Sequence, residues 1–78
     1  MKVTRYLEAM RIRPDRALIQ DAWIERALRE PIRESVQAVG RLRCWAQIPE
    51  AEVRYLRVVL LEDGDTVHNA FFDREFVP

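Results

Sequence analysis

The chain changes its pattern of apolar residues once, at Pro31. Before this proline, apolar residues recur at the spacing of a helix, and after it they alternate with polar residues as in strands. A weak helical pattern over residues 4–12 predicts a short first helix. This helix should stop before Pro14, because the residue that precedes a proline disfavours the helical conformation.

A stronger helical pattern follows over residues 15–30. Its apolar face is formed by Ile19, Trp23, Ile24, Ala27 and Leu28. Asp15 or Asp21 would cap the start of this helix, and the sequence does not choose between them. The proline that follows predicts an end at Arg29 or Glu30. One or two helices are therefore expected in the N-terminal part.

Four strands are predicted after these helices. The run 35–39 predicts a first strand at a sheet edge, and the clean alternation of residues 41–48 predicts a half-buried second strand. Residues 53–62 and 65–72 predict the third and fourth. Asp63-Gly64 predicts a type I′ hairpin turn between them, because both residues accept a positive φ. This order predicts an α+β domain whose helices cover one face of a four-stranded antiparallel meander.

Alternation assigns the strand residues to two faces of this sheet. The face under the helices should carry Leu42, Cys44, Ala46, Ile48, Leu56, Val58 and Leu60. The opposite face should gather Arg41, Arg43, Trp45, Tyr55 and Arg57. The register of the last hairpin decides whether His68 or Asn69 joins them, because a slip of one residue exchanges the two faces. We expect the functional site on this second face.

The length of 78 residues predicts one domain over residues 1–78, because so short a chain buries only roughly 60 to 65% of its unfolded surface. Cys44 is the single cysteine and His68 the single histidine, so neither a disulfide nor a zinc site can form within one chain. No metal or cofactor is expected. No signal region and no apolar stretch of roughly 20 residues is present, so we expect a cytoplasmic protein without membrane contact. The thin core makes a homodimer a candidate assembly.

Charge is unevenly distributed although the formal net charge is zero. Residues 1–60 carry 12 basic and 8 acidic side chains, whereas residues 61–78 carry one basic and five acidic. All basic residues but one are arginines, whose guanidinium groups bind phosphates and carboxylates through two donors. The arginine excess fits anion binding, and it fits equally the codon bias of a GC-rich genome.

Three runs in the second half of the chain form a recognisable set. They are Gly40–Trp45, Arg54–Leu61 and Thr66–Arg74, and a helix that ends before Pro31 precedes them. Together they resemble a family of small bacterial domains related to BrnT and, more distantly, to the RelE and ParE toxins. The resemblance covers about residues 15–76 and implies a RelE-like fold.

RelE-like toxins contact messenger RNA on the ribosome through basic and aromatic groups of the exposed sheet face, and an antitoxin covers that region. ParE relatives act on DNA gyrase. The resemblance therefore implies a toxin-like domain of a toxin-antitoxin system, with RNA or the ribosome and an antitoxin as partners. The enzyme it implies is a metal-independent endoribonuclease. The chain has neither the lysine-rich helix nor the tyrosine near the C-terminus typical of active RelE enzymes, so catalysis stays open.

The resemblance assigns roles residue by residue. The assignments are RNA or phosphate contacts for Arg41, Arg43, Arg57 and His68, and base stacking for Trp45 and Tyr55. By their chemistry, His68 and Arg57 are also the candidate catalytic residues. His68 would act as a general acid or base, because imidazole titrates near neutrality. Arg57 would stabilise the charge that develops on phosphate.

Each of these residues also has a structural alternative. His68 would hydrogen-bond beside Asn69 without any role in catalysis, and Trp45 and Tyr55 would pack on the sheet. Arg43 and Arg57 would pair across strands with Glu50, Glu52 or Asp73.

A second hypothesis is a non-enzymatic protein-interaction module with the same fold. It would use the same sheet face or the exposed edge of the first strand. RNA cleavage requires Arg57 and His68 to lie together and exposed, whereas an interaction module can bury both in an interface.

Overall fold

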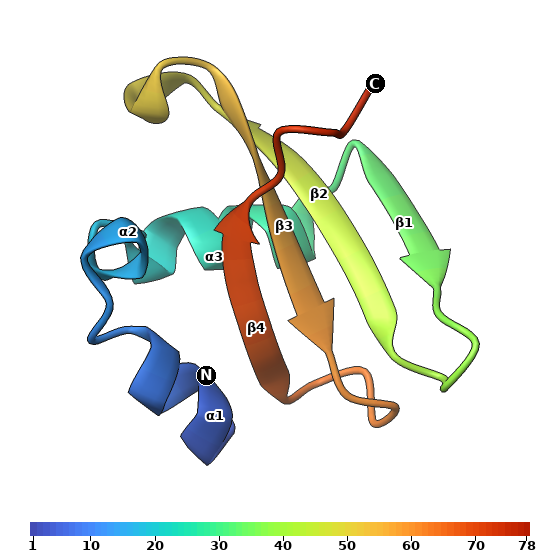
Figure 1. Cartoon of the computed structure of the whole chain (residues 1–78). Helices are drawn as coiled ribbons and strands as arrows, with labels where there is room; N and C mark the ends of the chain where they lie inside the picture. The colour runs from blue at the N-terminus through green and yellow to red at the C-terminus, as the bar shows by residue number, and fades with distance from the viewer.

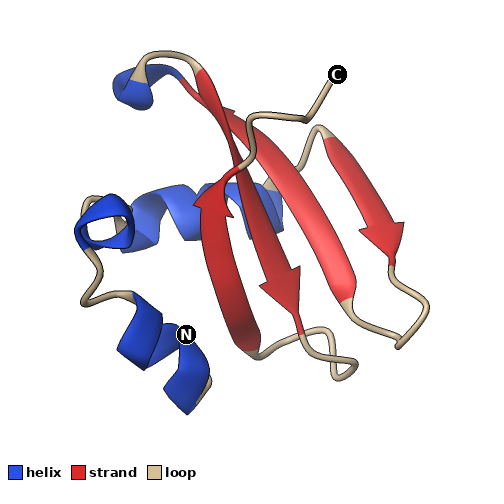
Figure 2. Ribbon diagram, viewed as in Figure 1, coloured by secondary structure: helices blue, strands red, loops and turns tan.

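Residues 1–78 form three helices and a four-stranded antiparallel sheet in the computed structural model (Figures 1 and 2). The helices are α1 (Arg5–Met10), α2 (Pro14–Ala17) and α3 (Asp21–Arg29). The strands are β1 (Arg33–Val36), β2 (Leu42–Ile48), β3 (Arg54–Leu60) and β4 (Val67–Phe72), with a short 3₁₀ helix, η1 (Pro49–Ala51), between β2 and β3. The predicted α+β class is confirmed, with helices preceding the sheet.

The sheet is a meander in the order β1-β2-β3-β4, with α3 across one of its faces and α1 and α2 beside the β4 edge (Figure 2). α3 packs across β2 and β3, while α1 packs against β4. The residues before α1 also join the sheet, because Val3 forms a parallel bridge with Val67. The backbone N–H of Thr4 donates to the Val67 carbonyl at 3.0 Å, and the Val67 N–H donates to the Lys2 carbonyl at 2.8 Å. The start of β4 is thus covered, whereas the outer edge of β1 has no strand partner.

The helix predicted over residues 15–30 is interrupted, which corrects the sequence-based expectation. Pro14 occupies the first turn of α2, which ends after Ala17, and α3 then begins at Asp21. The break turns the chain so that Ile19 and Trp23 both reach the core. Neither predicted aspartate caps α3, since the capping position is Gln20. The predicted end of the helix at residue 29 or 30 is confirmed.

The first hairpin differs from the prediction because of Gly40. β1 occupies residues 33–36, not 35–39, and residues 37–40 form the turn. Within it the Gly40 N–H donates to the Gln37 carbonyl at 2.8 Å, and the Gln37 N–H donates to the Arg41 carbonyl at 2.7 Å. Gly40 has a φ of +88°, which other residues adopt only with strain, so the turn forms there.

The connections of β3 are also longer than predicted. Val53 has a φ of 60°, so β3 begins one residue later than the sequence indicates. The predicted two-residue turn at Asp63-Gly64 is instead the six-residue loop 61–66, in which only Gly64 has a positive φ. The Asp63 carboxylate accepts the backbone N–H groups of Asp65 and Thr66, both at 2.9 Å, and this local bonding stabilises the wider loop.

The core lies between the helices and the sheet, and the face predicted to be covered is confirmed. Its residues Cys44, Ala46, Ile48, Leu56, Val58 and Leu60 are buried, and Leu42 packs against them. Burial and the nearby charge of Glu34 raise the pKa of the Cys44 thiol, so this residue acts as a small apolar side chain. No helix has both the length and the apolar character needed to cross a membrane.

Candidate functional site

The face of the sheet opposite the helices carries the predicted site residues, and we call it the open face. Cross-strand pairs such as Trp45 with Arg57 and Arg43 with Val59 place side chains of β2 and β3 next to each other. The C-terminal segment, residues 73–78, leaves β4 and crosses this face toward β1 (Figure 1). The segment covers one part of the open face and leaves the part near the β4 start uncovered.

A bulge in β4 decides which of its residues reach the open face. Val59 pairs with Asn69, but the next residue, Leu60, pairs with Val67, so His68 is an extra residue in the strand. Bulges of this kind redirect side chains. Both His68 and Asn69 line one recess, so the sequence-based choice between them does not arise.

This recess, which we call the His68 recess, is a cavity of about 290 Å³. It is lined by Tyr6, Gln37, Arg41, Arg57, Val59, His68, Asn69 and Phe71. The predicted residues Arg41, Arg57 and His68 therefore meet in one place, although they come from three different strands or turns. Pockets for small molecules span roughly 300 to 1,000 Å³, so this one suits a single small group.

His68 is half-buried and is held by the N-terminal part of the chain. Its Nδ1 lies 3.1 Å from Thr4 Oγ1, and its ring stacks on Tyr6 with 4.9 Å between centroids. Thr4 Oγ1 already accepts the backbone N–H of Leu7, so its own proton is free to be donated to Nδ1. Burial, and then the charge of Arg41, lower the pKa of His68 below its ordinary 6.5. At neutral pH His68 is therefore uncharged, the form that accepts a proton.

Two arginines that line the His68 recess each have a buried donor without a partner within the protein. These donors are Nε of Arg41 and Nε of Arg57, and no other buried side-chain nitrogen or oxygen of the chain lacks a partner. Buried polar groups are nearly always paired, because an unpaired one costs roughly 1–3 kcal/mol. Because both arginines line the same recess, an anionic ligand there would lie beside two guanidinium groups.

Arg57 is fixed between two aromatic rings and a carboxylate. Its guanidinium carbon lies 5.7 Å from the Trp45 centroid and 5.2 Å from the Phe71 centroid, and Nη1 lies 3.7 Å from Asp73 Oδ2. Burial raises the pKa of Asp73, but hydrogen bonds from Trp45 and the Glu75 backbone and the charge of Arg57 outweigh it, so the net pKa is lowered. The ion pair expected as a structural alternative is present, yet it leaves Nε of Arg57 unpaired.

Trp45 is covered by the C-terminal segment and is only 6% exposed. Phe76 stacks on the Trp45 ring with 5.1 Å between centroids. The indole Nε1–H of Trp45 donates to Asp73 Oδ2 at 3.0 Å. Arg33 lies over Phe76 and donates from Nη1 to the Val77 carbonyl at 3.0 Å. With the segment in this position a nucleic-acid base does not reach Trp45, whose ring anchors the segment instead.

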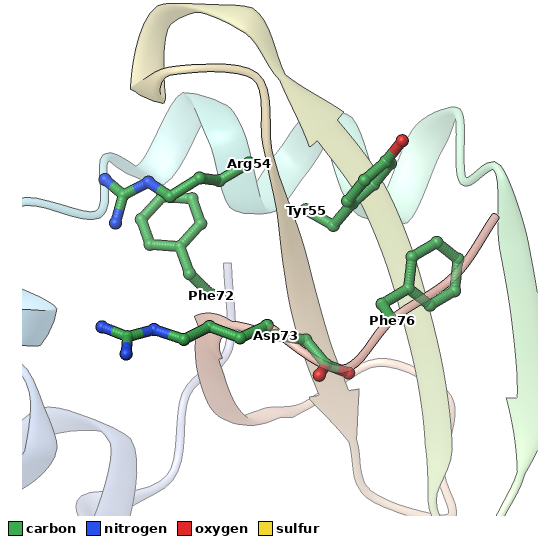
Figure 3. A pocket seen from close by; sticks show the side chains of 6 residues that line it. Arg54, Tyr55, Phe72, Asp73 and Phe76 are labelled. Carbon is green, nitrogen blue, oxygen red and sulfur yellow. The ribbon is translucent and has the colours of Figure 1, made fainter.

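Tyr55 lies beside the same segment in a second cavity, the tail recess, of about 320 Å³ (Figure 3). The tail recess is lined by Arg54, Tyr55, Phe72, Asp73, Arg74 and Phe76. The Tyr55 ring contacts Phe76 at 5.1 Å and is half-buried. Tyr55 is therefore separated from the His68 recess, which it does not line.

Arg43 also lies outside the His68 recess. Its Nε donates to Ser35 Oγ at 2.8 Å, and its guanidinium carbon lies 5.5 Å from the Trp45 centroid. It lines a cavity of about 390 Å³ under the C-terminal segment, to which Arg57 also contributes. The predicted residues thus divide among three cavities: Arg41 and His68 line the His68 recess, Arg43 and Trp45 line this neighbouring cavity, Arg57 lines both, and Tyr55 lines the tail recess.

Sequence reasoning missed several residues of the site. Phe71 shares its face with Asn69 by simple alternation, which was a usable signal. Tyr6 reaches the recess from α1, and no local pattern links that helix to His68. No group of three or more His, Cys, Asp or Glu residues is placed to hold a metal ion.

Comparisons of the chain with protein-family models, with curated proteins and with solved structures find no match, so the site is interpreted from its own residues.

Proposed function

We propose that this chain is a toxin-like domain that binds single-stranded RNA on its open face, with one phosphate in the His68 recess. The observation that carries the proposal is a pair of arginines, Arg41 and Arg57, that line one recess and that each have an unpaired Nε. A guanidinium group matches the geometry of a phosphate and donates to it strongly. The side-chain amides of Gln37 and Asn69 add further donors around the same cavity.

RNA explains more features of the surface than a small anion does. Arginines line all four surface cavities, although the chain has no net charge. Tyr6 stacks on His68 and remains 47% exposed, so its ring is open to a base. Arginines on phosphates and aromatic rings on unstacked bases are the usual means of binding single-stranded RNA.

The His68 recess also contains groups suited to RNA cleavage without a metal. Neutral His68 would accept the proton of a 2′-hydroxyl, whose oxygen forms a bond to the adjacent phosphorus. The bond from phosphorus to the 5′-oxygen breaks, and that oxygen takes a proton from the imidazolium or from water. Arg41 and Arg57 would stabilise the negative charge that builds up on the phosphate oxygens. Loss of cellular RNA would arrest growth, and an antitoxin covering the open face would prevent it.

The first test measures binding of a fluorescently labelled ten-nucleotide RNA to the unmodified chain and to Arg57→Gln. A lost charge-assisted contact is worth about 1.5–3 kcal/mol, so the variant should bind at least tenfold more weakly. Arg29→Gln is the matched control, because Arg29 is exposed on α3, away from the open face. Equal binding by the unmodified chain and Arg57→Gln would contradict the role given to the recess.

Controlled expression in bacteria tests the toxin-like role separately. Induction of the unmodified chain should arrest growth, and folded Arg57→Gln and His68→Gln variants should not. One outcome would indicate cleavage in addition to binding. In this outcome His68→Gln binds RNA as tightly as the unmodified chain but no longer arrests growth, whereas Arg57→Gln loses both properties. Arrest by all three chains would place the effect elsewhere.

The alternative function, protein interaction without catalysis, rests on the outer edge of β1. This edge has no strand partner, and the neighbouring Ile32, Val36 and Val39 are 52%, 66% and 68% exposed. An extended segment of a partner protein could add a strand there. Absence of RNA binding together with normal growth would favour this function.

A further inference from the structure

A second arginine-lined cavity lies at the edge of β4, next to the His68 recess. This β4-edge recess measures about 290 Å³ and is lined by Asp15, Arg16, Arg54, Phe71, Phe72 and Arg74. Its arginines come from α2, from the first residue of β3 and from the segment that follows β4. Three guanidinium groups face a single carboxylate, so the recess has an excess of positive charge.

Two of these arginines have donors that no protein group accepts. Arg54 donates its Nε to the Ala51 carbonyl at 2.9 Å, which leaves its two terminal amino groups free. Arg74 is exposed, and its side chain forms no hydrogen bond or ion pair. Arg16 differs, because its Nη1 donates to Asn69 Oδ1 at 2.7 Å. Arg54 and Arg74 are therefore the residues with donors available to a ligand.

Aromatic rings hold two of the guanidinium groups in place. The guanidinium carbon of Arg54 lies 4.0 Å from the Phe72 centroid, and Figure 3 shows the Arg54 side chain extended over that ring. The guanidinium carbon of Arg16 lies 5.2 Å from the Phe71 centroid. Such contacts use the flat face of the guanidinium and leave its N–H groups, which lie in the plane, for an anion.

Phe71 joins this recess to the His68 recess, because it lines both. Arg57 contacts the Phe71 ring from one cavity and Arg16 contacts it from the other, each at 5.2 Å. Asn69 also connects them, since it lines the His68 recess and accepts the hydrogen bond of Arg16. The two recesses therefore adjoin each other at Phe71.

We propose that the β4-edge recess is a second phosphate subsite, so that a single-stranded RNA passes over Phe71 with successive phosphates on its two sides. One phosphate contacts Arg41 and Arg57, and a neighbouring phosphate contacts Arg54 and Arg74. This inference rests on the RNA binding proposed above, and it adds the path of the strand over Phe71 and a minimum of two phosphates in the ligand.

The test compares Arg74→Gln with the unmodified chain, using the ten-nucleotide RNA at several salt concentrations. Arg74 has no partner in the protein, so the variant should fold normally, which circular dichroism and urea unfolding would verify. We expect about tenfold weaker binding and a salt dependence of log K reduced by about 0.7, the contribution of one phosphate in a single strand. Arg54→Gln should act in the same direction. Arg29→Gln should change neither quantity beyond the effect of one distant charge.

A ligand with one phosphate separates this subsite from the first. The dinucleotide uridylyl-uridine, followed by NMR, should bind Arg74→Gln as it binds the unmodified chain, and should bind Arg57→Gln more weakly. If Arg74→Gln left the affinity and salt dependence of the ten-nucleotide RNA unchanged while Arg57→Gln lost binding, the second subsite would be rejected and the proposed function would stand. Failure of the unmodified chain to bind RNA would overturn both.

Discussion

Arg41 lies half-buried in the His68 recess, where its Nε is unpaired and its side chain forms no ion pair. A residue in this position lowers the stability of the fold, because a buried donor without an acceptor costs roughly 1–3 kcal/mol. It also lowers the pKa of His68 by its charge. Both effects should be reversed by a substitution that keeps the bulk of the side chain and removes the guanidinium.

Arg41→Met should therefore stabilise the fold and weaken RNA binding. We expect the free energy of unfolding in urea to rise by about 1 kcal/mol, the typical effect of removing one unpaired buried donor. The pKa of His68, followed by NMR, should rise because a nearby positive charge is gone. RNA affinity should fall about tenfold, as for loss of one charge-assisted contact.

Arg43→Met is the matched control for this prediction. Arg43 donates to Ser35 and lies over Trp45, so its removal should destabilise the fold and leave the pKa of His68 unchanged. Equal destabilisation by Arg41→Met and Arg43→Met would show that the guanidinium of Arg41 is satisfied in the folded chain, and it would remove the main support for an anion in the recess.

The C-terminal segment is the element that most changes the open face. Phe76 stacks on Trp45 and contacts Tyr55, while Asp73 accepts the indole N–H of Trp45 and pairs with Arg57. A short segment without regular structure is thus held by aromatic and charged contacts. It decides which predicted aromatic rings are accessible.

Phe76→Ala should loosen this segment. Because Phe76 is only partly buried, we expect a loss of about 1 to 2 kcal/mol in the free energy of unfolding, less than the roughly 3–5 kcal/mol of a fully buried phenylalanine. The indole N–H of Trp45 should exchange faster with solvent in NMR spectra. The indole of Trp23, 8% exposed under the sheet, should be unaffected and serves as the internal control. Unchanged exchange at Trp45 would mean that Asp73 alone holds the segment.

Elements with a regular pattern were predictable from the sequence, and their connections were not. The alternation of residues 42–48 gave the strand and its buried face correctly, because one face of the sheet must be apolar. The turn at Asp63-Gly64 was misassigned, since the Asp63 carboxylate binds backbone groups two and three residues ahead and favours a wider loop. The break between α2 and α3 depends on how Ile19 and Trp23 pack, which periodicity does not reveal.

The candidate site shows the same division. Arg41 and Arg57 were placed on the correct face by alternation alone. His68 and Asn69 both line the His68 recess because of a bulge in β4, and a bulge leaves no periodic signal in the sequence. The coverage of Trp45 depends on contacts between residues far apart in the chain, so it was inaccessible to pattern reasoning.

At the scale of the whole molecule, the two faces of the sheet differ in what they require. The covered face is filled by apolar side chains and leaves no buried side-chain nitrogen or oxygen unpaired, since both unpaired atoms belong to arginines that line the His68 recess. Two carboxylates outside this recess stabilise the fold. Glu50 of η1 accepts two hydrogen bonds from Arg26 of α3, at 3.0 and 2.8 Å, and Asp63 holds the β3–β4 loop.

Acid should therefore destabilise the fold through these two carboxylates. The hydrogen bonds from Arg26 lower the pKa of Glu50 from 4.5 to about 2, and those from Thr66 lower the pKa of Asp63 from 3.8 to about 2. Unfolded chains bind these protons first as pH falls, so the stabilisation is complete above about pH 4.5 and is lost toward pH 2. The urea midpoint should fall over this window.

The double variant Arg26→Gln/Thr66→Val isolates this effect, provided that both chains also carry His68→Gln. Without that substitution, the lowered pKa of His68 would make stability fall with pH below 6.5 as well. The double variant should be less stable at pH 7 and should lose less on acidification, because its carboxylates titrate nearer their ordinary values. Asp73, whose pKa is also lowered, should leave a smaller residual dependence of the urea midpoint on pH. An equal fall of the urea midpoint in both chains would show that other carboxylates govern acid unfolding.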